Sequence, residues 1–304
     1  MKDTFLIIVK GFIIGSSMSV PGVSGGTMAI LLGIYDRMIS SVSHFFKDIK
    51  NNFFFLFKCC VGAVIGIGSL AFVIKWLLER FPIPVSFFFL GAVVGGIPAL
   101  YKKTKETPLK ISSGIYFLLG LIIVISIGFI PTGNLDFSNN TGITQLLMLL
   151  VTGIIIAIAL VLPGISTSHM LLILGMYDTM LLAITKFNII YLGILGFSVL
   201  IGVILITKPI EWTMKKFPHQ TYCMIIGFVL GSTTEIFKYK ILPAIPYNPY
   251  FGFWVKRILI NPAEALLHIF GTDLGFWVGS IVISIVTFLL GIGAIYSLSK
   301  ISND

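Results

Sequence analysis

The chain has 304 residues, of which 57% are hydrophobic and 11% are charged. A soluble domain of this size needs far more polar surface, so the composition excludes one and indicates a polytopic membrane protein. The net charge of +9 does not indicate a nucleic-acid partner, because the lysines and arginines collect in short segments between apolar runs, which is the pattern that orients membrane proteins.

The first apolar region, residues 4–43, is interrupted at residues 21–27 by the sequence PGVSGGT. Such a break frees backbone N–H and C=O groups that lipid cannot satisfy, so it must lie inside protein or face a wet cavity. We therefore expect a helical hairpin, either re-entrant or broken. Three longer apolar runs follow, each near the ~20 residues that span a bilayer as a helix. They cover residues 53–78, 85–101 and 111–130.

The second half has the same order of elements. A hairpin region at 143–185 contains the break PGISTSH at 163–169. The apolar runs after it cover residues 188–207, 219–235 and 274–298. Nine of nineteen positions are identical between residues 21–39 and 163–181. A break between apolar arms that occurs once in each half is typical of transporters built from inverted repeats.

We therefore predict an all-α membrane fold with two structural repeats, residues 1–135 and 136–304. Each repeat is a hairpin followed by three transmembrane helices, and the odd number of crossings inverts the second repeat. The matching junctions IKWLLERFP and IEWTMKKFP extend the duplication beyond the hairpins. The later glycines correspond as well, and their spacing predicts close packing of helices. These glycines are Gly91 and Gly95 in the first half and Gly227 and Gly231 in the second.

The distribution of lysine and arginine predicts the orientation in the membrane. Residues 102–110 contain four lysines and are expected in the cytoplasm, whereas residues 131–142 contain neither lysine nor arginine and are expected outside. Both chain ends then lie in the cytoplasm. The segment 236–272 is expected outside despite its three lysines and one arginine.

The two breaks contain residue types that bind anions. Serine and threonine cap the start of a helix, glycine lets backbone N–H groups approach a ligand, and helix N-termini attract phosphate. The predicted phosphate-binding residues are Lys10, Ser24, Gly25, Gly26, Thr27, Ser166, Thr167, Ser168 and His169. The residues that break the hairpins are Pro21, Gly22, Pro163 and Gly164. The alternative is that the serines only cap helices and the glycines only pack.

Several ionisable residues lie in or beside the apolar runs. Lys10 interrupts the first arm and either belongs to the site or extends to the cytoplasmic interface. The candidates for proton or sodium coupling, or for support of the site, are Asp36, Arg37, Asp178, Glu235 and His169. The alternative for the aspartates is capping at the hairpin ends, and Asp36 and Arg37 could form a surface pair. Cys59, Cys60 and Cys223 are expected to be free and buried, without metal-binding spacing.

An enzyme is the other class that the first break permits. Gly22-Val23-Ser24-Gly25 matches a short motif of intramembrane serine proteases, with His169 as the histidine partner. A catalytic site has no reason to duplicate its nucleophile, whereas a two-sided binding site does. The recurrence of the serine as Ser166 therefore favours transport.

The stretch KGFIIGSSMSVPGVSGGTMAILLGIYDRMI, with its echo LPGISTSHMLLILGMYD, resembles the bacterial polyprenyl-phosphate transporter (PopT-type) family over essentially the whole chain. The resemblance implies a translocase, not an enzyme, which returns undecaprenyl phosphate from the outer to the inner leaflet of the bacterial cytoplasmic membrane. By this resemblance, residues 21–27 and 163–169 would hold the phosphate head. Thr167 departs from the usual second motif, PGISGS, and His169, which follows the motif, is also unusual. Both weaken the match of the second half-site.

Two further expectations concern ligands. A secondary transporter for a small anion, with an aqueous path to the same inverted site, remains the alternative function. A lateral apolar slot beside the site would favour a lipid, and a closed polar vestibule would favour a solute. No metal, cofactor or nucleic acid is expected, and the expected partners are a polyprenyl phosphate, membrane lipids and a coupling proton or sodium ion.

Overall fold

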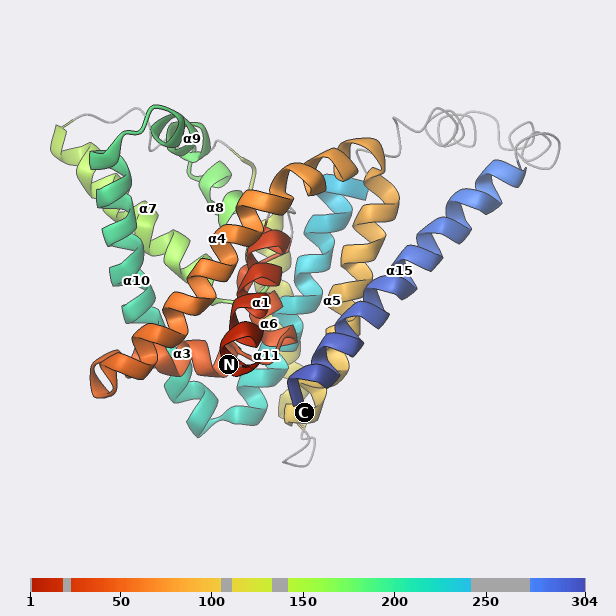
Figure 1. Cartoon of the computed structure of the whole chain (residues 1–304), viewed down its shortest axis with the longest axis horizontal. Helices are drawn as coiled ribbons and strands as arrows, with labels where there is room; N and C mark the ends of the chain where they lie inside the picture. Colours follow the sequence, from red (N-terminus) through yellow and green to blue (C-terminus); the bar gives the residue numbers. More distant parts are fainter. Residues whose placement is uncertain (1, 19–22, 105–110, 133–141, 242–273, 304) are drawn as a thin grey trace.

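The computed structural model describes residues 2–18, 23–104, 111–132, 142–241 and 274–303, and within them it contains helices and no strand (Figure 1). The first half contains α1 (Lys2–Met18), α2 (Gly25–Leu31), α3 (Tyr35–Ser43), η1 (Phe45–Lys47), α4 (Ile49–Arg80), α5 (Pro82–Thr104) and α6 (Ile111–Phe129). The second half contains α7 (Gly142–Val161), α8 (Thr167–Ile173), α9 (Tyr177–Thr185), α10 (Ile189–Lys216), α11 (Pro218–Ile236), the π turn η2 (Phe237–Ile241) and α15 (Leu274–Asn303). The prediction of an all-α fold is confirmed.

Each of the six long apolar runs that were predicted as crossings lies within one helix, apart from at most one residue at an end. These helices are α4, α5, α6, α10, α11 and α15. Among the described residues, four helices are long and apolar enough to cross a membrane. They are α4, most of α5, α7 and α10. The bent pair α8 and α9, with 111° between the two helices, makes a fifth if it is counted as one span. α7, which forms the first arm of the second predicted hairpin, thus has the length of a full crossing.

Both hairpin regions consist of one long helix, a break, a short helix, a second bend and another short helix. At the second bends, Gly33 and Gly175 have φ values of 69° and 67°, in the left-handed region that favours glycine. In Figure 1 the chain start and α3 lie at the lower end of the molecule, whereas α9 lies at the upper end. The two hairpin regions therefore end on opposite sides.

The junctions between long helices repeat as well. Phe81 caps the C-terminal end of α4 with φ −132° and ψ 58°, and Phe217 caps that of α10 with φ −132° and ψ 57°. A proline follows in each case and starts the next helix, where its missing N–H costs no hydrogen bond. The aligned Phe-Pro sequences thus form the same corner.

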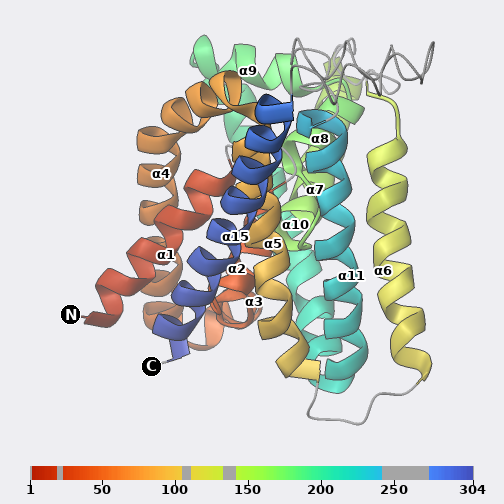
Figure 2. The same cartoon turned by 90° about the vertical axis from the view of Figure 1, so that its right-hand side faces the viewer.

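The predicted glycines lie where helices pack closely. α5 packs along α15, and α11 packs along α6 (Figure 2). A Cβ atom on Gly91 would lie 2.0 Å from the carbonyl oxygen of Phe288, and one on Gly227 would lie 2.2 Å from that of Phe117. The prediction of close packing at these glycines is confirmed. The contacts join α5 of the first half to α15 of the second, and α11 of the second half to α6 of the first.

The segments rich in lysine lie at one end of the molecule. His219, at the start of α11, donates from Nδ1 to the Thr104 carbonyl oxygen at 2.9 Å and contacts the Ser113 hydroxyl, so the end of α5 and the start of α6 lie beside it. The N and C labels lie at this same end in Figure 1. At the other end, Lys238 donates to the Gly128 carbonyl oxygen at 2.7 Å. The segments 105–110, 133–141 and 242–273 lie outside the described residues.

The cysteines agree with the sequence in part. All three are free, and Cys59 and Cys223 are buried as expected. The prediction that Cys60 is buried is wrong, because its side chain is on the exposed side of α4.

Candidate functional site

The two breaks contact each other directly. The backbone N–H of Gly164, in the second break, donates to Ser24 Oγ and to Thr27 Oγ1 of the first, both at 2.9 Å. The Tyr35 hydroxyl donates to the Val161 carbonyl oxygen at 3.0 Å, just before the second break. Segments that are far apart in sequence are thus joined in the interior of the fold. Pro21 and Gly22 lie outside the described residues.

The two serines cap the short helices that follow the breaks. Ser24 Oγ accepts from the backbone N–H of Thr27 at 3.1 Å, and Ser166 Oγ accepts from that of His169 at 3.4 Å. Both serines have extended backbone angles, as helix caps do. Capping by Ser24 and Ser166 is confirmed, and Thr27 and Ser168, the other candidate caps, lie inside the first turns instead.

Gly164 is the residue at which the second break is most constrained. Its φ of 84° lies in the left-handed region, and an added Cβ atom would lie 2.3 Å from the carbonyl oxygen of Phe228 in α11. The same tight packing brings Gly26 close to Pro163, because a Cβ on Gly26 would lie 3.3 Å from the Pro163 Cα. Only glycine combines this backbone angle with this close approach.

A small polar cavity of about 10 Å³ separates the two capped helix starts. Its lining includes Ser24, Gly25, Ser166, Thr167 and Ser168. This volume holds about one water molecule, which is too little for a phosphate group. The breaks are therefore in contact in a closed arrangement.

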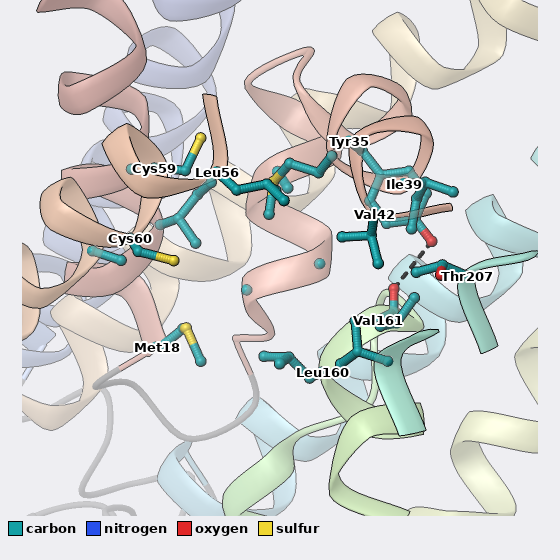
Figure 3. Close-up of a pocket in the computed structure, with 18 residues that line it drawn as sticks. Met18, Tyr35, Ile39, Val42, Leu56, Cys59, Cys60, Leu160, Val161 and Thr207 are labelled. Atoms are coloured by element: carbon teal, nitrogen blue, oxygen red, sulfur yellow. Dashed lines mark hydrogen bonds between the residues drawn. The ribbon is translucent and has the colours of Figure 1, made fainter. Parts of the chain in front are cut away.

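A second, apolar cavity of about 230 Å³ lies beside the first break (Figure 3). Gly25 and Gly26 form part of its wall, so it reaches the backbone at the start of α2. Met18 of α1 and Leu56, Cys59 and Cys60 of α4 line one side, Tyr35, Ile39 and Val42 another, and Leu160, Val161 and Thr207 the side of α7 and α10. The lining suits a hydrocarbon chain and not a hydrated ion.

The structure joins two candidate residues, His169 and Glu235, that were predicted independently of each other. His169 Nδ1 lies 3.0 Å from Glu235 Oε1, with His169 in the first turn of α8 and Glu235 near the end of α11. His169 is 5% exposed and Glu235 is 2% exposed. A buried carboxylate requires a partner of this kind, because an unpaired charge in the interior is costly.

The other charged candidates lie farther from the breaks. Lys10 is buried in α1, about 12 Å along the helix axis before Met18, and its burial argues against an extension to the interface. Asp36 Oδ2 accepts from the Tyr222 hydroxyl at 3.0 Å, and the Arg37 guanidinium lies 4.3 Å from the centre of the Phe55 ring.

The aspartates of the two hairpins occupy equivalent places, in the first turns of α3 and α9. A carboxylate there stabilises a helix N-terminus, which agrees with the capping alternative. Asp178 is exposed, so the structure does not bring it to the breaks.

One buried acidic residue was missed by the sequence reasoning. Glu211 of α10 accepts from Lys215 Nζ at 2.7 Å and lies 3.0 Å from His44 Nδ1, which follows α3. It joins the end of the first hairpin to α10 at the end rich in lysine. Its signal was a glutamate in the aligned junction at 210–218, where the first half has Lys75.

Comparisons with known proteins show which family the chain resembles. Residues 14–249 match a family described as undecaprenyl phosphate translocase-like. The chain is 37% identical over 251 residues to a polyprenyl-phosphate transporter of Staphylococcus aureus (strain NCTC 8325 / PS 47), which covers 79% of this chain and 87% of that protein. It is 29% identical over 246 residues to a polyprenyl-phosphate transporter of Vibrio cholerae serotype O1 (strain ATCC 39315 / El Tor Inaba N16961), covering 76% and 77%. No solved structure matches the chain.

Proposed function

The chain belongs to the undecaprenyl phosphate translocase-like family, and we propose that it returns undecaprenyl phosphate from the outer to the inner leaflet of the bacterial cytoplasmic membrane for reuse in cell-wall polymer synthesis. The family is one of transporters and not of enzymes, so the protease alternative is dropped. The translocation direction, the phosphate site, the mechanism and the ion coupling are the parts that we infer.

The apolar cavity beside the polar breaks is the observation that supports a lipid most directly. The tail of a lipid phosphate can stay in a hydrocarbon environment while its head crosses, so its carrier needs an apolar slot next to an anion site. The 230 Å³ cavity has this character and is bounded by Gly25 and Gly26 of the first break. A small anion would need a polar vestibule instead, and the lining of this cavity offers none.

The proposed head site comprises the two breaks. Their hydroxyl groups and backbone N–H groups lie together, and hydrogen-bond donors of both kinds hold phosphate well. We assign the head to Ser24, Gly25, Gly26, Thr27, Ser166, Thr167, Ser168 and His169, with Lys10 supplying positive charge from α1. In the closed arrangement the donors and acceptors bind each other, so the breaks must separate before a phosphate can enter.

Separation of the breaks leads to an alternating-access mechanism. The hairpins end at opposite sides, and the Phe81 and Phe217 corners and the Gly33 and Gly175 bends are alike. These similarities support two inverted repeats, residues 1–135 and 136–304, that rock against each other. The segments rich in lysine and both chain ends share one side, which supports a cytoplasmic location for that side.

Energetics favour coupling to an ion gradient. Moving a negative head inward against an inside-negative potential costs about 2.3 kcal/mol per charge per 100 mV. A proton or sodium ion that moves with the head would offset this cost. Transport in vesicles that is indifferent to both gradients would exclude the coupling.

The proposed function is tested with purified protein in lipid vesicles. Labelled undecaprenyl phosphate should move between leaflets at a rate that rises with the amount of protein, because the head has a polar path. Uptake of inorganic phosphate into the same vesicles should stay at the level of protein-free vesicles. Phosphate uptake without lipid movement would support the small-anion alternative instead.

A cysteine pair tests whether the breaks must separate. Val23 and Ile165 both line the small cavity between the breaks. In a background without the native cysteines, crosslinking Val23→Cys to Ile165→Cys should abolish transport, and reduction should restore it. The single variants treated with the same reagent are the control. Full transport by the crosslinked protein would contradict alternating access at the breaks.

A further inference from the structure

A third cavity, of about 550 Å³, lies at the end of the molecule opposite to the chain ends. It is lined by residues of α5, α6, the end of α11 and η2, among them Thr233, Thr234, Glu235 and Lys238. Two threonine side chains, a carboxylate and an ammonium group give it more polar groups than the cavity beside the first break. It has room for several water molecules.

Glu235 connects this cavity to the second break. Its side chain lines the cavity, and its Oε1 atom lies 3.0 Å from Nδ1 of His169. The backbone N–H of His169 in turn donates to Ser166 Oγ, the helix cap at that break. Two ionisable side chains thus lie between an open cavity and the proposed head site, and both are buried.

The pair is not needed to build this part of the fold. In the aligned first half, Thr27 takes the place of His169 and Ala99 takes the place of Glu235. The first half forms its capped short helix without any ionisable group at these positions. A buried ion pair seldom adds stability over apolar residues of similar size, so the second half keeps this pair for a reason other than packing.

We propose that the His169–Glu235 pair is the proton-binding site that couples translocation to a pH gradient, and that protons reach it through the cavity formed by α5, α6, α11 and η2. This inference rests on the proposed function and names its coupling site. With neutral His169 and ionised Glu235 the pair carries one negative charge. One proton converts it to an imidazolium–carboxylate pair without net charge.

Proton binding and phosphate binding then favour each other. An imidazolium in the first turn of α8 attracts an anion at the second break, whereas the negative pair repels one. Because such coupling is reciprocal, the phosphate also raises the proton affinity of the pair. Proton and headgroup are thus loaded from the same side and released together on the other.

Other charged and titratable groups lie on the elements packed against the pair. Lys238 lines the same cavity from η2 and donates to the Gly128 carbonyl oxygen at 2.7 Å. Among the described residues, the other titratable side chains of the elements packed against α8 and α11 are, on α9, Tyr177 and Asp178; on α10, Tyr191, Lys208, Glu211, Lys215 and Lys216; on α5, Tyr101 and Lys102; on α6, Tyr116; and on α11 itself, His219, Tyr222 and Cys223. Of these, Asp178 is exposed, and Glu211 pairs with Lys215 and His44 at the other end of the molecule.

The test measures the leaflet ratio of labelled undecaprenyl phosphate at steady state, with the membrane potential clamped at zero. The pH is 7 outside and 8 inside. Both values lie above the second pKa of about 6 of a phosphate monoester, so the charge of the headgroup changes little between the two sides. One proton per headgroup predicts about tenfold accumulation on the alkaline side, because one pH unit equals a tenfold concentration ratio in free energy. Glu235→Gln and His169→Gln should lower this ratio to about one.

Glu211→Gln is the matched control, since Glu211 is also buried and paired with a histidine but lies at the other end. It should keep the tenfold ratio. A tenfold ratio that persists in Glu235→Gln overturns the inference. Wild-type transport that does not respond to the pH gradient also overturns it, but leaves the proposed function intact. Absence of any lipid movement by the wild type counts against the proposed function itself.

A second readout covers a Glu235→Gln variant that does not transport. In weakly buffered detergent solution, addition of undecaprenyl phosphate to the wild type should cause proton uptake, and addition to the variant should cause none. Equal uptake by both overturns the inference.

The proton route is tested by labelling. Thr233→Cys in a background without native cysteines should react with a membrane-impermeant maleimide from the side opposite to the chain ends. Reaction only from the other side would contradict the proposed route.

Discussion

A Ser24→Ala, Thr27→Val double variant should transport undecaprenyl phosphate about tenfold more slowly than the wild type, or worse. Ser24 Oγ and Thr27 Oγ1 are both acceptors for the Gly164 N–H, and both are assigned to the phosphate head. Without these hydroxyl groups the buried N–H of Gly164 has lost both acceptors, which destabilises the closed arrangement by about 1–3 kcal/mol. The phosphate head loses two binding groups at the same time. Since about 1.4 kcal/mol is a factor of ten, the loss in rate should be easy to measure.

The measurement is the initial rate of leaflet exchange per amount of folded protein. Ser86→Ala is a matched control, because Ser86 is fully buried in α5 and its hydroxyl donates within its own helix. It should keep near-normal transport. Ser166→Ala should reduce transport less than the double variant, because its hydroxyl accepts only a 3.4 Å hydrogen bond from the His169 N–H. Wild-type rates in the double variant would remove the first break from the head site.

Gly164→Ala should be the most destabilising single substitution at the breaks. A left-handed φ costs an alanine about 1–2 kcal/mol, and φ at Gly164 is 84°. The added Cβ would also lie 2.3 Å from the Phe228 carbonyl oxygen, so the backbone of the break or of α11 must move. Overpacking of this kind costs about 1–3 kcal/mol, which gives a total of roughly 2–5 kcal/mol.

Thermal unfolding in detergent provides the readout, and Gly142→Ala separates the two contributions. Gly142 also has a left-handed φ, of 62°, but an added Cβ there would meet nothing within 4 Å. Its substitution should cost only the backbone strain. If Gly164→Ala were no more destabilising than Gly142→Ala, the close contact between the second break and α11 would be wrong.

The elements of the fold could be predicted because their causes are local. Each long apolar run forms a helix, a Phe-Pro dipeptide ends one helix and starts the next, and Ser24 and Ser166 cap the helices that follow them. Gly91 and Gly227 could be assigned to close contacts because small residues allow helix backbones to approach in lipid. The helices that they contact, α15 and α6, could not be assigned, because spacing within one helix does not identify its neighbour.

The parts of the site that were not predicted depend on contacts between distant segments. His169 and Glu235 were each recognised as unusual, but nothing local indicates that α8 and the end of α11 meet. Glu211 looked like an ordinary residue near a basic helix end, and only its pairing with His44 shows that it is buried and partnered. The apolar cavity has no sequence signal, because it is the space left between α1, α3, α4, α7 and α10.

The pairing of α5 with α15 also has a consequence for biosynthesis. α5 is complete once residue 104 has been made, but the helix that covers its glycine face begins at residue 274. During translation α5 must therefore wait in the bilayer, with lipid or insertion machinery against its glycine face, until residues 274–303 have been inserted. The α5–α15 contact thus forms only after α15 is inserted, and premature termination before α15 would leave an incomplete bundle for membrane quality control to remove.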